Sequence, residues 1–143
     1  MTWNVLRADD ASWRPSNQLG VLNTDVAVQL GASGAMGARL WRLEPGQWST
    51  RHRHGHTAEL YVLVEGTGRI RIEDELLTLA PLDMVFVEPE HVRQVFNDGD
   101  TPQLWLVIGT PPEAANTLNM EAAQLEFLYP QGPKAPPPEL SGA

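Results

Sequence analysis

The sequence predicts an all-β fold with one short helix near its C-terminal end. Short apolar runs of about four to eight residues follow one another through the middle of the chain, each bounded by turn-forming residues. No long stretch with helical periodicity separates them. After Pro111 and Pro112 the composition shifts to Ala, Glu, Leu, Met and Gln, which favours a helix. Short strands without a long intervening helix are typical of a sandwich or a closed barrel.

Three turn signals separate the expected strands. Glu44-Pro45-Gly46 is typical of a type II turn, Glu73-Asp74 of a tight hairpin, and Asn97-Asp98-Gly99-Asp100 of a loop between strands. The run Arg69-Ile70-Arg71-Ile72 alternates charged and apolar residues, so one face of that strand is expected to be buried. The predicted strands are Met36–Leu43, Trp48–His54, Glu59–Glu65, Gly68–Ile72, Glu75–Leu79, Met84–Val87, Val92–Phe96 and Gln103–Ile108.

The chain is expected to form one domain over residues 1–130, with its core at residues 36–110. The arm at residues 1–35 is polar and Gly-rich, and its one good strand pattern is Val26–Leu30, which we expect to pair at a sheet edge. A helix is expected at about residues 121–128, before Pro130 stops it.

The last segment, residues 131–143, is rich in proline and poor in apolar side chains. Such a composition predicts a disordered or extended tail that does not pack. Proline also lacks the N–H group that a sheet requires, so the tail is expected to be dispensable for folding.

The composition excludes several classes of function. The formal net charge of −8 argues against a nucleic-acid partner, which needs a basic surface. Cysteine is absent, so neither a disulfide framework nor a thiolate metal site is expected, and a bound ion must use nitrogen and oxygen ligands. The first ten residues are charged, and no run approaches the length of a membrane span. We therefore expect a cytoplasmic protein without a cleaved leader or a membrane partner.

Two histidines and a glutamate predict a metal site. His52 and His54 are two residues apart, so on an extended strand both imidazoles leave the same face. Glu59 follows a short turn and opens the apolar run of residues 60–64, as expected for the first residue of a returning strand. Two imidazoles and one carboxylate with open positions suit one divalent ion per chain, either iron, manganese, nickel or zinc.

The spacing around these residues resembles a known family. Gly46-x5-His52-x-His54-x4-Glu59-x6-Gly66 is similar to the complete first motif of the cupin superfamily. The family's second motif reads Gly-Asp, a short strand, Pro-x-Gly, His and, four residues later, Asn. The chain keeps Asp83 and Asn97, but the glycines are lost. The resemblance covers roughly residues 36–110, and it implies a jelly-roll β-barrel, also called a double-stranded β-helix, with a metal or ligand pocket inside.

Three alternatives are open for the fourth ligand position. Arg93 stands where the family's fourth ligand, a His, usually stands. A guanidinium cannot ligate a cation, but it can bind a substrate carboxylate. A slip of two residues would instead bring His91 to the metal, and an exposed strand would give neither residue a role. Trp48 and Tyr61 flank the first motif on adjacent predicted strands and are further candidates for substrate binding.

The resemblance implies several functions rather than one, because similar barrels act as dioxygenases, isomerases, lyases or ligand carriers. The main expectation is a metal-dependent enzyme acting on a small carboxylate-bearing molecule, with no catalytic base that the sequence can identify. The alternatives are a non-enzymatic binding or sensing protein and a sugar-isomerase-like enzyme. Most such barrels are dimers, so the resemblance also implies a homodimer.

Overall fold

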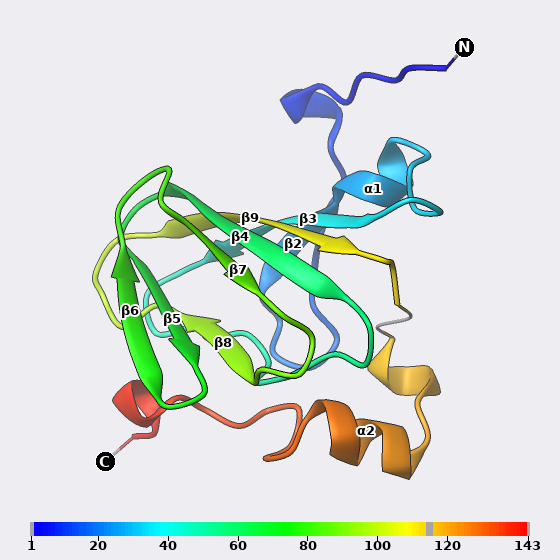
Figure 1. Ribbon diagram of the computed structural model, residues 1–143. Coiled ribbons are helices and arrows are strands. Elements are labelled where there is room, and N and C mark those ends of the chain that lie inside the picture. The colour runs from blue at the N-terminus through cyan, green and yellow to red at the C-terminus, as the bar shows by residue number, and fades with distance from the viewer. Residues whose placement is uncertain (1, 114–115, 143) are drawn as a thin grey trace.

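Two antiparallel sheets form the body of the structure, a computed structural model that describes residues 2–113 and 116–142 (Figure 1). Within these residues the larger sheet has the strand order β1-β2-β3-β9-β4-β7, and the smaller sheet has the order β6-β5-β8. The strands are β1 (Trp13–Pro15), β2 (Leu22–Asp25), β3 (Gly37–Leu43), β4 (Ala58–Glu65), β5 (Gly68–Ile72), β6 (Glu75–Leu79), β7 (Met84–Val87), β8 (Arg93–Phe96) and β9 (Gln103–Thr110).

The hydrophobic core lies between the two sheets. In β9 the side chains alternate, so that Trp105 and Val107 are buried while their neighbours are partly exposed. The indole N–H of Trp105, which is fully buried, donates to Gln103 Oε1 over 2.9 Å. Both sheets supply the core cluster, which consists of Val21, Leu43, Tyr61, Leu63, Ile70, Val87, Val95, Trp105 and Val107. The all-β jelly-roll barrel predicted from the sequence is confirmed.

The predicted strand Trp48–His54 is not a regular strand. This segment meets β8 at two isolated bridges, Trp48 with Phe96 and His52 with Arg93. The backbone of His54 leaves β8 and donates to the carbonyl of Pro89 over 2.8 Å. The other strands predicted between Met36 and Ile108 are present, and their ends shift by no more than two residues.

The N-terminal arm differs from its prediction. Val26–Gln29 forms the short helix α1 and not a strand, because Asp25 caps it and accepts from Val28 N over 3.0 Å. The strands of the arm are β1 and β2, which pair with each other and extend the larger sheet beyond β3. The arm therefore does pair at a sheet edge, but through β1 and β2 and not through the predicted strand at Val26–Leu30.

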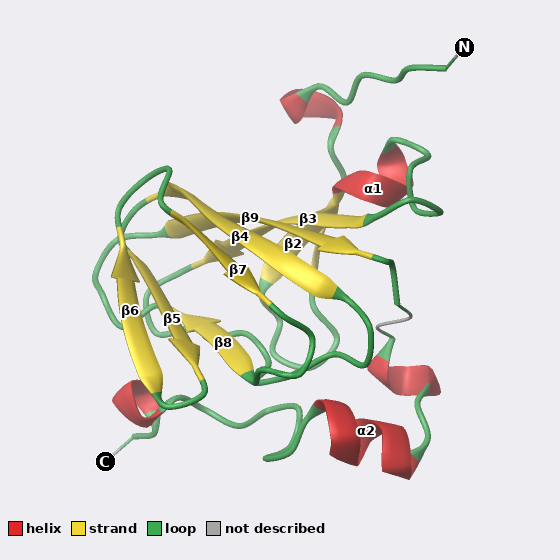
Figure 2. Cartoon of the chain, in the orientation of Figure 1, coloured by secondary structure: helices red, strands yellow, loops and turns green. Residues whose placement is uncertain are grey.

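Helices lie outside the sheets (Figure 2). The predicted C-terminal helix is present as α2 (Ala122–Leu128), and short 3₁₀ turns occur at η1 (Ala8–Asp10), η2 (Thr117–Asn119) and η3 (Pro138–Leu140). In the part of the chain that the structure describes, none of the helices has the length and apolar character that crossing a membrane requires.

The C-terminal segment packs against the smaller sheet, so the expectation of an unpacked tail is wrong for residues 131–142. Gln94, which is 1% exposed on β8, donates through Nε2 to the carbonyls of Ser49 and Ala135, each over 2.9 Å. Arg71 Nη2 lies 2.8 and 2.5 Å from the two carboxylate oxygens of Glu139. The proline residues supply no N–H, but Lys134 and Ala135 supply carbonyl acceptors, which every residue carries whatever its side chain.

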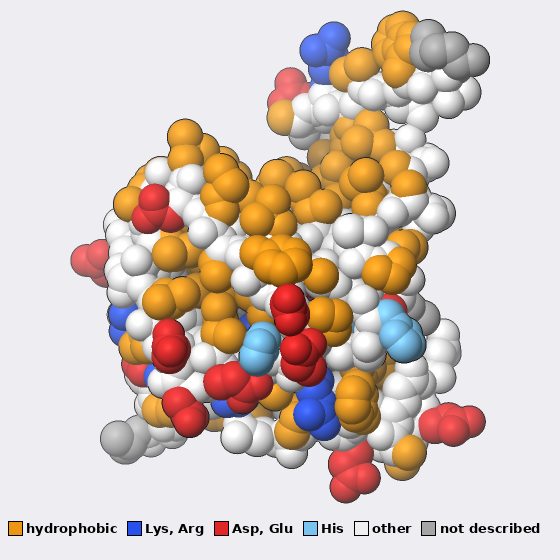
Figure 3. Space-filling model, in the orientation of Figure 1, with side chains coloured by type: hydrophobic (Ala, Val, Ile, Leu, Met, Phe, Trp, Pro, Cys, Tyr) orange, Lys and Arg blue, Asp and Glu red, His pale blue; other side chains and the backbone are white. Residues whose placement is uncertain are grey.

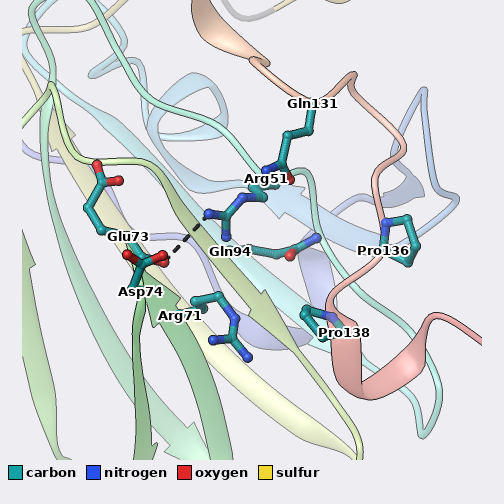
Figure 4. A pocket seen from close by; sticks show the side chains of 8 residues that line it. All are labelled: Arg51, Arg71, Glu73, Asp74, Gln94, Gln131, Pro136 and Pro138. Carbon is teal, nitrogen blue, oxygen red and sulfur yellow. Dashed lines mark hydrogen bonds between the residues drawn. The ribbon is translucent and has the colours of Figure 1, made fainter.

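A hollow of about 260 Å³ remains between this segment and the sheet (Figure 4). Its lining residues are Arg51, Arg71, Glu73, Asp74, Gln94, Gln131, Pro136 and Pro138. The division of the chain into a single domain at residues 1–130 and a tail at residues 131–143 remains a prediction.

Truncation after Gln131 should lower the thermal midpoint by roughly 5–10 °C, a shift that corresponds to a few kcal/mol for a domain of this size. The variant loses the Ala135 acceptor of a buried amide and the ion pair of Arg71. Glu139→Gln, which removes only the ion pair, should produce a smaller fall in a calorimetric scan. An unchanged midpoint after truncation would restore the dispensable tail that the sequence predicts.

Candidate metal centre

The segment between β3 and β4 carries both candidate imidazoles, and it is held in place by its backbone. His52 N donates to Arg93 O over 2.9 Å, and Arg93 N donates to His52 O over 2.8 Å. Glu59 is the second residue of β4, opposite Gly109 of β9. A side chain at Gly109 would meet the Thr57 side chain at 2.7 Å, so the absence of a Cβ there leaves room beside Glu59.

The ligand atoms of His52, His54 and Glu59 all lie within 4.8 Å of one another. Glu59 Oε1 is 3.5 Å from His52 Nε2 and 3.3 Å from His54 Nε2. The two imidazole rings stand at 88° to each other with their centroids 5.0 Å apart. The three side chains are only slightly exposed, so they form a nearly enclosed group of two nitrogens and one oxygen.

The outer ring nitrogen of each histidine has a hydrogen-bond acceptor. His52 Nδ1 lies 3.0 Å from the carbonyl oxygen of Thr50, and His54 Nδ1 lies 3.3 Å from Glu113 Oε2. A carbonyl or carboxylate oxygen cannot donate, so these contacts require hydrogen on Nδ1 and leave a lone pair on each Nε2. Such outer contacts are what orients histidines that bind metals.

These lone pairs fit a cation. His54 Nε2 is buried and has no hydrogen-bond partner among the described residues, although it lies 3.3 Å from Glu59 Oε1. Two imidazole lone pairs and a carboxylate oxygen facing the same point repel one another unless a positive charge lies between them. The donor set therefore fits a divalent ion that accepts nitrogen and oxygen ligands.

Protons compete for the same position. Burial alone would raise the pKa of Glu59, but the adjacent His52 and His54 hold it well below its ordinary value. Burial alone would lower the pKa of His54, but the carboxylates of Glu59 and Glu113 raise it above its ordinary value of 6.5. Without metal, a proton on His54 supplies part of the charge that the group requires.

Zinc affinity should therefore decrease as the pH falls from roughly 8 to 6, because the ligating imidazoles must be neutral. Since the pKa of His54 is raised, protonated His54 is present at a higher pH than for an ordinary histidine, and the decrease should begin above pH 6.5. Calorimetric titration with zinc at several pH values measures this. An affinity that stays flat across this range would contradict imidazole ligation.

Tyr61 and Arg93 both contact Glu59. The Tyr61 hydroxyl donates to Glu59 Oε1 over 2.8 Å. The pKa of Tyr61 is raised well above its ordinary value, mainly because the side chain is buried and also because the charge of Glu59 lies close to it. Arg93 is fully buried, with Nε 3.8 Å from Glu59 Oε1. Its Nη2 donates to the carbonyls of Glu88 and Val87 over 2.9 and 3.4 Å, so the guanidinium also supports the loop after β7.

The other two candidates lie elsewhere. His91 is 48% exposed, and its Nδ1 lies 3.8 Å from Glu73 Oε1. It forms an exposed group with Glu88 and Glu90 and does not join His52, His54 and Glu59. Trp48 faces the C-terminal segment, where its indole N–H donates to Lys134 O over 3.3 Å.

Two residues near the group were not expected from the sequence. Glu113 accepts from the backbone N–H groups of His56 and Thr57, the latter over 2.8 Å, as well as contacting His54. The ring of Tyr129 has its centroid 6.3 Å from that of His52, and burial and the charge of Glu59 raise the pKa of Tyr129. Both follow the last strand and lie more than fifty residues from the group along the chain, so no local pattern indicates them.

An antiparallel barrel with a His-His-Glu group on its inner side defines a class of small β-barrels suited to holding a divalent ion. The family model described as "Cupin domain" matches residues 39–109, which contain all three of these residues. The chain is a member of the cupin superfamily, and the fold of solved cupin structures agrees with that assignment.

Three individual proteins that resemble this chain share at most about a third of their residues with it over the matched parts. A 5-nitrosalicylic acid 1,2-dioxygenase from Bradyrhizobium sp. is 31% identical over 71 residues, which are 47% of this chain and only 34% of that enzyme. A sugar phosphate isomerase of the cupin superfamily from Silicibacter pomeroyi is 26% identical with a TM-score of 0.65, covering 75% of each chain. A predicted oxalate decarboxylase from Thermotoga maritima is 20% identical with a TM-score of 0.65, covering 74% of this chain and 97% of that one, and shows similarity of fold alone.

Proposed function

We propose that this cupin is a metal-dependent enzyme, dioxygenase-like or related, that acts on a small carboxylate-bearing molecule. The observation that carries the proposal is the orientation of the two imidazoles, whose Nδ1 atoms have acceptors and whose Nε2 atoms face Glu59. His52, His54 and Glu59 would hold one iron, manganese, nickel or zinc ion per chain. Such an ion supplies a Lewis acid, and iron also supplies the redox chemistry of a dioxygenase.

Arg93 Nε is the proposed contact for the substrate carboxylate. This N–H is buried and has no hydrogen-bond partner among the described residues. Its nitrogen lies 3.8 Å from Glu59 Oε1, and thus close to the proposed metal ligands. It can donate one charge-assisted hydrogen bond to a substrate oxygen, whereas Nη2 is already engaged by backbone carbonyls. Tyr61 acts in this proposal by fixing Glu59 through its hydroxyl. The indole of Trp48 donates to Lys134 O in the C-terminal segment, so its contacts with the described residues support no role in binding substrate.

Oxygen uptake tests the proposal. Protein loaded with Fe(II) under anaerobic conditions is mixed with air-saturated buffer and salicylate or another hydroxylated aromatic acid, a choice supported by the similarity to a nitrosalicylate dioxygenase. We expect consumption of oxygen that requires iron and disappears when His52 and His54 are both replaced with Ala. Absence of uptake across a panel of small aromatic and aliphatic acids would contradict a dioxygenase.

A sugar-isomerase-like activity is the second candidate, supported by the similarity to a sugar phosphate isomerase. Turnover of aldoses or ketoses with zinc or manganese in the absence of oxygen would favour it. Tight retention of a ligand without turnover under either condition would favour a non-enzymatic binding cupin.

We also propose a homodimer in the cytoplasm. β7 ends the larger sheet, and Leu82, Met84 and Phe86 around it are 69%, 60% and 63% exposed. Figure 3 shows apolar side chains gathered over the part of the surface where β4, β7 and β9 lie in Figure 1. Sedimentation of the wild type should give a dimer, and Phe86→Glu should give a monomer. Leu118→Glu, at an apolar residue exposed elsewhere, is the control, and a monomeric wild type contradicts the proposal.

A further inference from the structure

A hollow of about 540 Å³ is lined by residues of β6 and β7, by the end of β5 and the turn that follows it, and by His91. Two residues of its wall are cross-strand partners of residues that contact Glu59, since Val85 pairs with Tyr61 and Ile72 pairs with Arg93. Directly opposed residues of antiparallel strands project to the same face. The hollow therefore lies on the side of the sheets that carries the candidate metal centre.

The wall and the rim of this hollow differ in character. Ile72, Leu77 and Val85 make an apolar wall. Glu73 and Asp74 form the turn between β5 and β6, Glu75 is the first residue of β6, and these three acids form the rim together with His91. Among the described residues that line the hollow, none is Lys or Arg.

Further acidic residues surround His91. Its Nδ1 lies 3.8 Å from Glu73 Oε1, and it also groups with the exposed Glu88 and Glu90. Figure 3 shows acidic side chains gathered around a histidine on the lower part of this face. One imidazole and the guanidinium of Arg51, which donates to the carbonyl of Glu73, do not balance the five carboxylates of the rim and its neighbours, so we expect a negative potential at the opening.

We propose that this hollow admits the body of the substrate and selects molecules with an anionic group at one end only. The inference rests on the proposed function, in which that one group is taken up next to the metal and Arg93. The rest of the molecule would be apolar and neutral, or cationic, because it lies against Ile72, Leu77 and Val85 and below the acidic rim. Dicarboxylates and phosphate esters that project a second negative charge to the opening would be rejected.

Benzoate and terephthalate test the selection, because they share an aromatic body and differ by a second carboxylate at the far end. Binding to the cobalt-loaded full chain is followed by the visible spectrum of the ion. We expect benzoate to bind about tenfold more tightly than terephthalate at low ionic strength, and the ratio to shrink at high salt. Equal affinities would overturn the selection, and no spectral change with either compound would overturn the placement of the hollow beside the ion.

Replacing the rim acids isolates their contribution. Asp74→Asn combined with Glu75→Gln should improve terephthalate binding at least threefold and leave benzoate almost unchanged. Asp9→Asn combined with Asp10→Asn makes the same change of charge on η1, at the far end of the molecule in Figure 1, and should have no effect. An unchanged ratio in the rim variant would overturn the role of the acids. Failure of the proposed function would instead appear as absence of bound cobalt or of turnover, whatever the charge of the probe.

Discussion

Simultaneous replacement of His52 and His54 with Ala should abolish binding of a divalent ion, which the wild type should bind with a stoichiometry of one per chain. The variant keeps only Glu59, and a single carboxylate in water binds such ions weakly. Elemental analysis of protein purified without an affinity tag, and titration with zinc, measure the stoichiometry. We expect this to be the largest change in affinity that any pair of substitutions produces.

His91→Ala is the matched control, because it removes an imidazole that is exposed and lies outside the group. It should leave the stoichiometry and affinity unchanged. Metal bound to the double variant would exclude His52 and His54 as the main ligands. Loss of metal from His91→Ala would instead favour the register in which His91 is the fourth ligand.

Arg93→Ala should reduce the free energy of unfolding of the metal-free protein by about 3–5 kcal/mol, the usual cost of removing one partner from a buried ion pair. The substitution removes the guanidinium beside the Glu59 carboxylate and the donor that Nη2 supplies to the carbonyls of Val87 and Glu88. Denaturant unfolding measures the loss. Saturating zinc should restore part of it, since the bound ion would neutralise Glu59 instead.

Arg93→Met distinguishes charge from volume, because it keeps much of the buried chain and removes the guanidinium. A loss close to that of Arg93→Ala would assign the effect to charge and hydrogen bonding. A nearly wild-type Arg93→Met would mean that Arg93 acts only by filling space. Arg93→His should tighten zinc binding if position 93 faces the ion, because an imidazole there would restore the family's usual fourth ligand.

The fold and the three central residues could be predicted because their signals are local. Strand lengths, turn residues and the spacing from Gly46 to Gly66 are all read within short windows. The motif glycines have a backbone reason to be glycine, with φ of 86° at Gly46 and 87° at Gly66. At Gly66 a Cβ would also meet the Pro102 carbonyl oxygen at 2.3 Å.

The remaining features depend on contacts between distant parts of the chain. The role of Glu113 requires that the end of β9 approach residues 55–57, and the packing of the tail requires carbonyl groups that composition does not reveal. The strand pattern at Val26–Leu30 was outweighed by the Asp25 cap and by the side chain of Gln29, which donates to Thr24 Oγ1 over 2.7 Å. Arg93 lies beside Glu59, as in one of the three alternatives that the sequence leaves open, and no local pattern indicates its contacts with backbone carbonyls.

The segment that carries the imidazoles is anchored by residues synthesised much later. Arg53 donates from its backbone to Leu128 O over 2.9 Å and from Nε to Phe127 O over 2.6 Å, and its guanidinium lies 4.2 Å from the centre of the Phe127 ring. Glu113, which orients His54, also follows the whole barrel in sequence. During translation, every strand of both sheets therefore leaves the ribosome before the residues that anchor this segment, so the imidazoles can take their final positions around Glu59 only after the whole barrel has been made.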